Sequence, residues 1–214
     1  GGLRGLGLPP AALPVEPPQT AERVRRARRP IASDRLLCGW KVVGHGHPDW
    51  AALELLTTLL AGSPSARLHR RLVIERELAS TVDVQLTPFR DPSLLRIAVT
   101  CARGHRAEEA LAEIDRVIAD LAERGVDPAE LEKTQNLTET DFWSALVDAD
   151  GKAEALGHHE TALGDFRTLG ELAERLGAVS ADDLRRVVRE YLVPRARTVI
   201  VAEPDGTASA DGDG

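Results

Sequence analysis

The sequence predicts an α+β domain in which helices pack on one face of a single mixed or antiparallel β-sheet. Two neighbouring runs with alternating apolar residues, separated by the turn-forming loop "TPFRDP", predict a β-hairpin. Strand-like apolar runs near the two ends of the chain can join that hairpin in one sheet. Helical periodicity in most of the remaining chain supplies the second layer.

The first half of the chain has a recognisable helix start after each turn. Asp49 is expected to cap a helix in which Leu53 and Leu56 share the apolar face, and Ser63 before Pro64 is expected to start the next one. The expected elements, in chain order, are a strand at 34–43, helices at 49–61 and 63–78, strands at 80–86 and 93–101, a helix at 106–123, a helix from 128 into the 150s with one break, helices at 166–176 and 181–192, and a strand at 197–203.

The second half carries clear signals for where helices end and begin. The run from Arg106 to Glu123 shows apolar residues at helical spacing, and Gly125 is expected to close that helix. Asp127 followed by Pro128 is typical of a new helix start, and "SADD" resembles a capping box. The last strand, "RTVIVAE", completes the sheet.

The composition is that of an ordinary globular protein, with 43% hydrophobic and 29% charged residues among 214. Three Trp, three Phe and one Tyr are too few for aromatic cofactor cages or base-stacking platforms. The net charge of −7 argues against a general nucleic-acid binder. The run 23–29 holds five arginines, and we interpret it as part of a linker with solvated or acid-paired charges in preference to a nucleic-acid contact.

We divide the chain into a Pro- and Gly-rich linker or strap at 1–22, one domain at 23–204 and a flexible tail at 205–214. The absence of methionine suggests an excised or processed piece. The start lacks a signal-peptide pattern, and no apolar run approaches the roughly 20 residues that span a bilayer. These features predict no membrane partner and favour a cytoplasmic location.

The histidines do not have the H-x-x-E-H spacing of a helical zinc motif. "GHGH", with His45 and His47, is expected to be a turn. "GHHE", with His158 and His159, is expected to lie on a solvated helix face, because neighbouring side chains on a helix diverge by about 100°. The residues alone therefore predict no metal site.

Nucleophilic catalysis has no support either. No serine lies in a G-x-S-x-G elbow, and Cys38 and Cys101 fall within strand-like runs, where buried free thiols are expected. The residue chemistry by itself thus predicts an α+β domain without a self-contained active site.

Several phrases, in this order, resemble one known family. "HPDWAALELLTTLLAGSPSARLHRRL" resembles a helix of the form D-x-x-A-L-x-L-L followed by G-x-x-S-R-L-x-x-x-L. "IAVTCARGHRAEEALAEIDRVIADLAERGVDPAELEKTQN", "GKAEALGHHETALGDF" and "VSADDLRRVVREYLVPRARTVIVAEP" are similar to the later strands and helices. The chain from about 24 to 204 therefore resembles the M16 zinc peptidases, of the pitrilysin, insulinase and mitochondrial processing peptidase type.

The resemblance implies that the chain is one of two α+β halves that close like a clam shell around a peptide-holding chamber. In this family, one half carries H-x-x-E-H and a distal glutamate, which bind zinc and activate water. Because this chain lacks H-x-x-E-H, it resembles the non-catalytic, usually C-terminal, half. Zinc is then expected in the partner half and none in this chain, and the Pro-rich start would be the tether.

The resemblance also points to substrate-facing positions. Many non-catalytic halves carry an Arg and a Tyr seven positions apart, in phrases like "LREERGLAY", and here Val73 and Ser80 occupy those places. Neither can replace the missing hydrogen bonds. Arg71 and Arg76 are the nearby candidates to substitute, although helix geometry directs them elsewhere. The arginines of 66–82 are expected to form a solvated face.

Our leading hypothesis is the inactive half of an M16-type zinc metalloendopeptidase, which closes the chamber and supports a zinc-bearing half on the same polypeptide or a separate subunit. Peptides would be the substrates, and the chain alone would cleave nothing. The alternative is a purely structural or binding module, as the core proteins of respiratory complex III are within this family.

Overall fold

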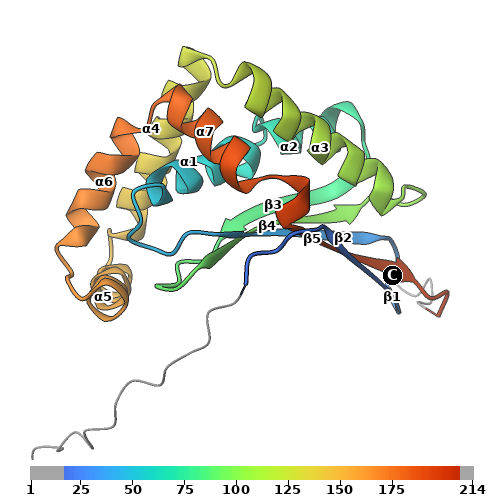
Figure 1. The fold of residues 1–214 in the computed structure, drawn as a ribbon, viewed down its shortest axis with the longest axis horizontal. Helices are drawn as coiled ribbons and strands as arrows, with labels where there is room; N and C mark the ends of the chain where they lie inside the picture. Colours follow the sequence, from blue (N-terminus) through green and yellow to red (C-terminus); the bar gives the residue numbers. More distant parts are fainter. Residues whose placement is uncertain (1–16, 208–214) are drawn as a thin grey trace, which may run out of the picture.

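The computed structural model describes residues 17–207 and contains a five-stranded sheet beneath a layer of helices (Figure 1). The strands are β1 (Arg23–Arg29), β2 (Arg35–Val42), β3 (Ala79–Leu86), β4 (Ser93–Cys101) and β5 (Arg197–Pro204). Their order in the sheet is β1-β5-β2-β4-β3. β1 and β5 run parallel and the other neighbours antiparallel, so the sheet is mixed. The predicted fold class is confirmed.

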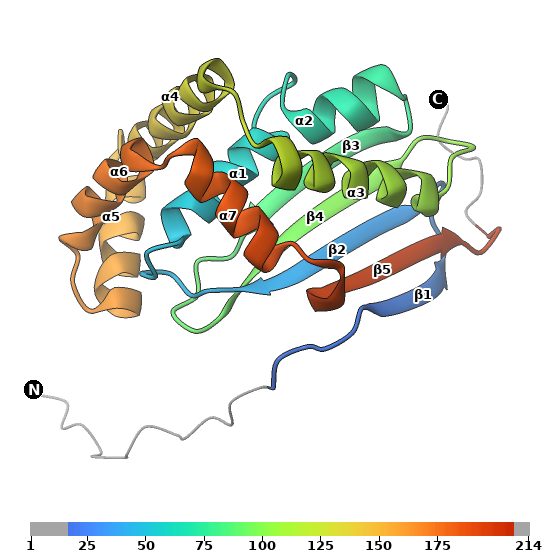
Figure 2. The same ribbon diagram turned by 45° about the horizontal axis from the view of Figure 1, so that its top comes forward.

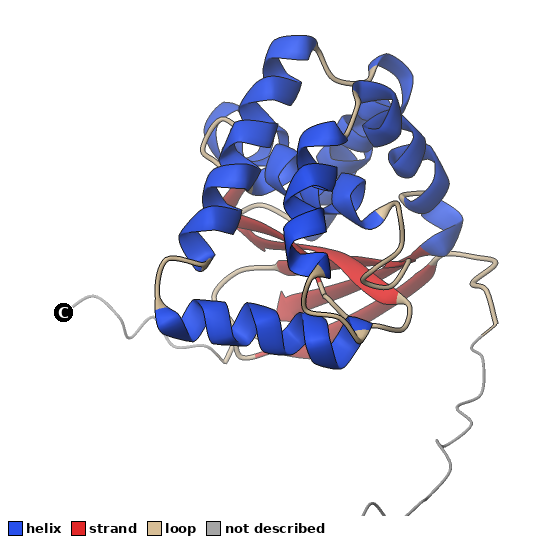
Figure 3. Ribbon diagram, turned by 90° about the vertical axis from the view of Figure 1, so that its left-hand side faces the viewer, coloured by secondary structure: helices blue, strands red, loops and turns tan. Residues whose placement is uncertain are grey.

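The two faces of the sheet differ because alternate residues of each strand point to opposite sides. In β4 the alternate residues Leu95, Ile97, Val99 and Cys101 are buried against the helices. Trp40 of β2 lies opposite Leu95 and is fully buried. Within residues 17–207 the helix layer lies on one face of the sheet, and the helix at 149–158 lies beyond one end of the strands (Figure 1 and Figure 3).

The arginine-rich run 23–29 is a strand, so its interpretation as part of a linker is wrong. Its backbone pairs along its whole length with β5, from Arg23 opposite Thr198 to Arg29 opposite Pro204. Six of its seven residues are exposed, because it forms an edge of the sheet where the helix layer does not reach. Backbone pairing, and not an apolar pattern, makes this segment a strand.

The helix layer is built around α1 (Trp50–Ala61), which packs against β3, α4, α6 and α7 (Figure 2). Eight of its twelve residues are buried, so the helix has little solvated surface. The other helices are α2 (Arg67–His69), α3 (Ala107–Arg124), α4 (Pro128–Ala145), α5 (Ala149–His158), α6 (Thr168–Ala178) and α7 (Ala181–Tyr191).

The predicted helix at 63–78 is shorter than expected. It starts at Arg67 because Ala66 is extended, and Ser63 and Pro64 form a turn before it. α2 then continues as a π-helical turn over Arg70–Glu75. Glu77 has a φ of 51°, a left-handed conformation that ends the helix and starts the turn into β3.

The caps of the later helices agree with the sequence pattern. Gly125 follows α3 with a φ of 73°, and Asp127 accepts a hydrogen bond from the Glu130 amide at the start of α4. Ser180 and Asp183 form the predicted capping box of α7. The long helix expected from 128 breaks once, between α4 and α5, as predicted.

The described part of the N-terminal segment contacts the start of β5. Gln19 Nε2 donates to the carbonyl of Arg197 at 2.7 Å, and Glu22 pairs with the Arg197 guanidinium at 2.6 Å. Residues 1–16 and 208–214, which hold most of the predicted linker and tail, lie outside the described residues. The proposed boundaries at 22/23 and 204/205 stay predictions.

Candidate functional site

The first candidate site is the segment from α2 to β3, which holds the predicted substrate-facing positions. Arg71 Nε donates to Glu113 at 2.7 Å, and Arg76 Nε lies 3.6 Å from the same carboxylate. Arg116 of the same domain also pairs with Glu113. The Glu113 side chain is only 3% exposed. Burial acts to raise the pKa of Glu113, but the surrounding arginines, Arg71 first, lower it on balance. Arg71 and Arg76 therefore hold a buried carboxylate in its charged form.

The two positions aligned with the family pair have ordinary surroundings. Val73 is half-buried and packs against the core, and the exposed Ser80 donates a hydrogen bond to the carbonyl of Thr100 at 3.3 Å. Val73 presents no polar atom, and the Ser80 hydroxyl is occupied locally.

The expectation that the arginines of this segment are solvated is wrong for Arg67. Its guanidinium donates to Glu130 of α4 at 2.6 Å and to the carbonyl of Gly125 at 3.0 Å, and its side chain is 16% exposed. Arg67 thus connects α2 to the turn between α3 and α4. The arginines of this region bind other parts of the same domain.

The second candidate site is a cluster of imidazoles formed by the two histidine motifs, which are 113 residues apart in the sequence. His45 Nδ1 lies 3.1 Å from His158 Nε2 and shares a hydrogen bond with it. The His159 ring contacts the His45 ring edge-on, with ring centroids 4.9 Å apart. His159 is buried and hydrogen-bonded to Thr168 at 2.8 Å, so the expectation that "GHHE" is a solvated face is wrong for this residue.

The surroundings of His45 and His159 favour neutral imidazoles. Burial lowers the pKa of His45 to about 4, and the neighbouring His159 and His158 act in the same direction. Burial also lowers the pKa of His159. His45 Nδ1 and His158 Nε2 contact each other, and no group of three or more His, Cys, Asp or Glu within residues 17–207 is placed to hold a metal ion. The residues described do not fit a zinc centre.

Asp49 has a different role from the predicted helix cap. Its side chain makes no capping hydrogen bond with α1. The carboxylate accepts hydrogen bonds from Arg186 Nη2 and from the Tyr191 hydroxyl, both at 2.7 Å and both on α7. The hydrogen bond from Arg186 is the main cause that lowers the pKa of Asp49. Asp49 thus fixes the start of α1 to α7.

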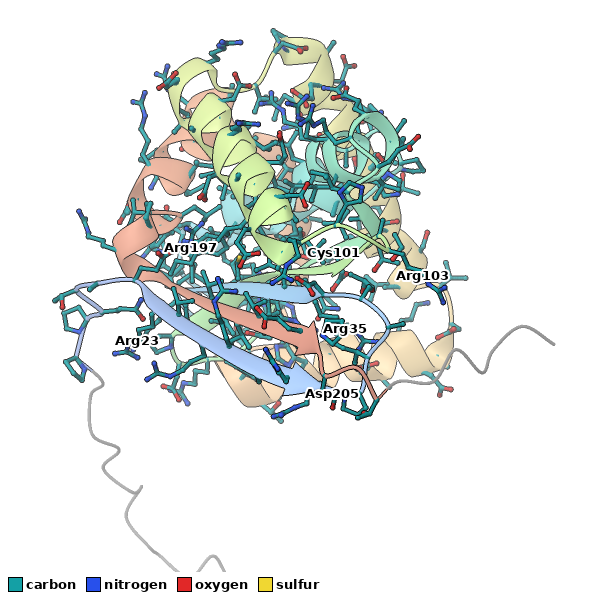
Figure 4. The ribbon with its side chains drawn as sticks, turned by 90° about the vertical axis from the view of Figure 1, so that its right-hand side faces the viewer. Arg23, Arg35, Cys101, Arg103, Arg197 and Asp205 are labelled. Carbon is teal, nitrogen blue, oxygen red and sulfur yellow. The ribbon has the colours of Figure 1, made fainter. Side chains whose placement is uncertain are left out.

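Two further groups are structural. Cys38 and Cys101 are buried free thiols, as predicted, and burial raises the pKa of Cys38 to about 12 and of Cys101 to about 11. Arg197 lies between the sheet and the helices (Figure 4), where it pairs with Asp115 of α3 and with Glu22. Neither thiol has the exposed, electropositive surroundings of a nucleophile.

The sequence profile described as "Peptidase M16 inactive domain" matches residues 4–138. The chain is 25% identical over 177 residues to the uncharacterised zinc protease YmxG of Bacillus subtilis, covering 82% of this chain and 43% of that protein. It is 23% identical over 198 residues to the uncharacterised zinc protease SCO5738 of Streptomyces coelicolor, covering 90% and 43% respectively. The chain thus spans less than half the length of these two relatives.

Solved structures share the fold. A protease from Helicobacter pylori superposes with a TM-score of 0.83 at 25% identity, covering 92% of this chain and 49% of that one. An inactive peptidase domain from Bordetella parapertussis superposes with a TM-score of 0.74 at 26% identity, covering 83% and 96%. The two-layer architecture is therefore that of a peptidase-type α+β domain.

The profile match over most of the chain assigns the family. The chain belongs to the M16 inactive-domain family, and its relatives include zinc proteases. The resemblance drawn from the sequence phrases is confirmed.

No helix within residues 17–207 is both long and apolar enough to cross a membrane.

Proposed function

We propose that this domain is the non-catalytic half of a zinc metalloendopeptidase, and that it closes a peptide-holding chamber against a zinc-bearing half. The observation that carries the proposal is the M16 inactive-domain match combined with coverage of 43% of two zinc-protease relatives. A domain of this size leaves room in such a protein for a second half. The partner half would supply every zinc ligand, since the residues described here do not fit a metal centre.

The chemistry of this chain in that assembly is to bind and orient a peptide. The zinc, held by the partner, would polarise the scissile carbonyl and activate water. The buried ion-paired groups of this domain, such as Glu113, keep its own elements rigid and provide no proton transfer. Peptide substrates, a partner in cis or in trans, and a cytoplasmic location are all parts of this proposal.

Reconstitution tests the proposal. The chain and a separately expressed half carrying H-x-x-E-H are expected to cleave a quenched fluorogenic peptide when mixed, and a chelator is expected to abolish the signal. Neither part alone is expected to cleave appreciably. Chelator-sensitive cleavage by this chain alone would contradict the proposal, and so would a zinc half whose cleavage rate does not change when the chain is added.

The second candidate function is a scaffold of the same fold, which the absence of the family Arg and Tyr favours. It makes a different prediction in the same experiment. A scaffold would form a stable complex with its partner half, measured by size-exclusion chromatography, without any peptide cleavage.

Restoring the family pair tests whether the positions of Val73 and Ser80 face the substrate. Hydrogen-bond donors aimed at a developing oxyanion contribute as much as about 100-fold in rate. V73R/S80Y in the reconstituted enzyme is therefore expected to raise kcat/KM for peptide hydrolysis by at least about 5-fold. Each single substitution serves as a control and is expected to give less. An unchanged kcat/KM, with the melting temperature preserved, would show that these positions do not face the substrate.

A further inference from the structure

A cavity of about 520 Å³ lies among α1, β3, α4 and α6. It is within the size range of small-ligand sites in proteins. Its walls come from α1 and from three elements that pack against α1, namely β3, α4 and α6. One wall is the edge strand β3, which has no neighbouring strand on its far side within the described residues.

The titratable residues of this cavity are all acidic. Glu54 of α1, Asp83 of β3 and Asp141 of α4 line it, and none of its lining residues is Lys, Arg or His. Asp83 and Asp141 are exposed, whereas Glu54 is half-buried. Within residues 17–207 the Glu54 carboxylate has no hydrogen bond or ion pair, in contrast to Asp49 and Glu113, which are fully partnered.

The partial burial of an unpartnered carboxyl group has an energetic consequence. Burial raises the pKa of Glu54 to about 6, so the charged form is disfavoured until a cation replaces the lost water. A ligand that brings a positive charge to Glu54 would recover this cost. Asp83 and Asp141 add negative potential at the entrance, through which the ligand would pass.

The remaining walls define the shape of the ligand. Trp50, Phe142, Leu172 and Leu176 line the same cavity with apolar and aromatic surface. A long aliphatic stem packs on such surface while its charged head stays at a polar group. Aromatic faces also attract cations, guanidinium groups in particular.

We propose that this cavity binds the side chain of an arginine or lysine residue of a peptide, with Glu54 as the ion-pair partner. The inference rests on the proposed peptide-holding function and assigns it a specificity. It places the preference for a basic residue in the non-catalytic half, on a face that contains no metal ligand.

Direct binding to the chain tests this site separately from cleavage. Two fluorescently labelled nine-residue peptides are compared, one with a central arginine and one with citrulline, which has the same shape but no charge. The arginine peptide is expected to bind about 10-fold more tightly by fluorescence anisotropy at pH 7.5. Its advantage is expected to shrink as the pH is lowered through about 6, because Glu54 is then protonated.

Glu54→Gln is the decisive variant, since it keeps the shape of the side chain and removes its charge. It is expected to abolish the difference between the arginine and citrulline peptides, whereas E154Q, on an exposed position of α5 outside the cavity, is expected to leave it unchanged. Equal binding of the two peptides by the unaltered chain, or a full arginine preference in E54Q, would overturn the inference. Arginine-selective binding without cleavage in the reconstituted pair would keep the site and remove the proposed peptidase function.

Discussion

Removing both negative partners of Arg197, with E22Q and D115N together, is expected to lower the free energy of unfolding by about 3 kcal/mol. The Arg197 side chain is 5% exposed, whereas Glu22 is 35% and Asp115 is 46% exposed. Burial alone would lower the pKa of Arg197, and the hydrogen bonds from its guanidinium to Asp115 and Glu22 reverse that effect. Without these partners a guanidinium charge stays buried beside Trp40 and cannot be rehydrated.

Replacing Arg197 itself is expected to lower the free energy of unfolding less, because its two carboxylate partners can then be solvated. R197M should lower the unfolding free energy by only about 1 kcal/mol, and E22Q/D115N/R197M should be more stable than E22Q/D115N. Urea denaturation of the set measures these differences. E171Q, which breaks the exposed pair with Arg175 on α6, is the control and is expected to cost less than about 0.5 kcal/mol. If the changes in unfolding free energy caused by the three substitutions simply add, the buried charge of Arg197 is not the cause of the loss.

Acidification is expected to destabilise the domain through His45. In the unfolded chain His45 titrates near its ordinary pKa of 6.5, and in the folded domain near 4. Between these values the unfolded state binds more protons, so stability is full above about pH 6.5 and falls as the pH decreases. The loss attributable to His45 should be about 2 kcal/mol on going from pH 7 to about pH 4.5, after allowance for its partial hydration.

Carboxylates also titrate in this range, so the measurement is a comparison of variants. The unfolding free energy of H45N is expected to fall less steeply with decreasing pH than that of the unaltered domain. H69N is the control, because the ring of His69 hydrogen-bonds only the local carbonyl of Pro64. Parallel pH profiles for H45N and the unaltered domain would show that the histidine cluster is not the cause.

The sequence predicts those parts of the fold that depend on local patterns. The hairpin of β3 and β4, the stripe of α3 and the cap at Asp127 all follow from residues within one or two turns of each other. β1 was missed because arginines carry no strand pattern, and its structure depends on pairing with a strand about 175 positions later. Asp49 was misassigned for the same reason, since its partners Arg186 and Tyr191 come from α7.

The candidate sites likewise combine features that local sequence patterns predict with contacts that they do not. The resemblance identifies the family and the positions Val73 and Ser80, but no local spacing indicates that Arg71 and Arg76 converge on Glu113. The histidine cluster combines two motifs that are 113 residues apart, so neither motif by itself predicts the cluster. Glu54 lies within a mostly apolar helix, and only the packing of β3, α4 and α6 around it makes its carboxyl group distinctive.

The parallel pairing of β1 with β5 also sets the order in which the domain can be completed during synthesis. Among the strands of residues 17–207, β1 is synthesised first. Its pairing partner β5, which separates it from β2, is synthesised last of these strands. Contacts so distant in sequence close a long loop and form late. β2, β3 and β4 and the helices that pack on them can assemble early, with one edge of β2 open until β5 arrives. A stalled or C-terminally shortened chain would therefore expose that edge to other chains, and would be prone to aggregation.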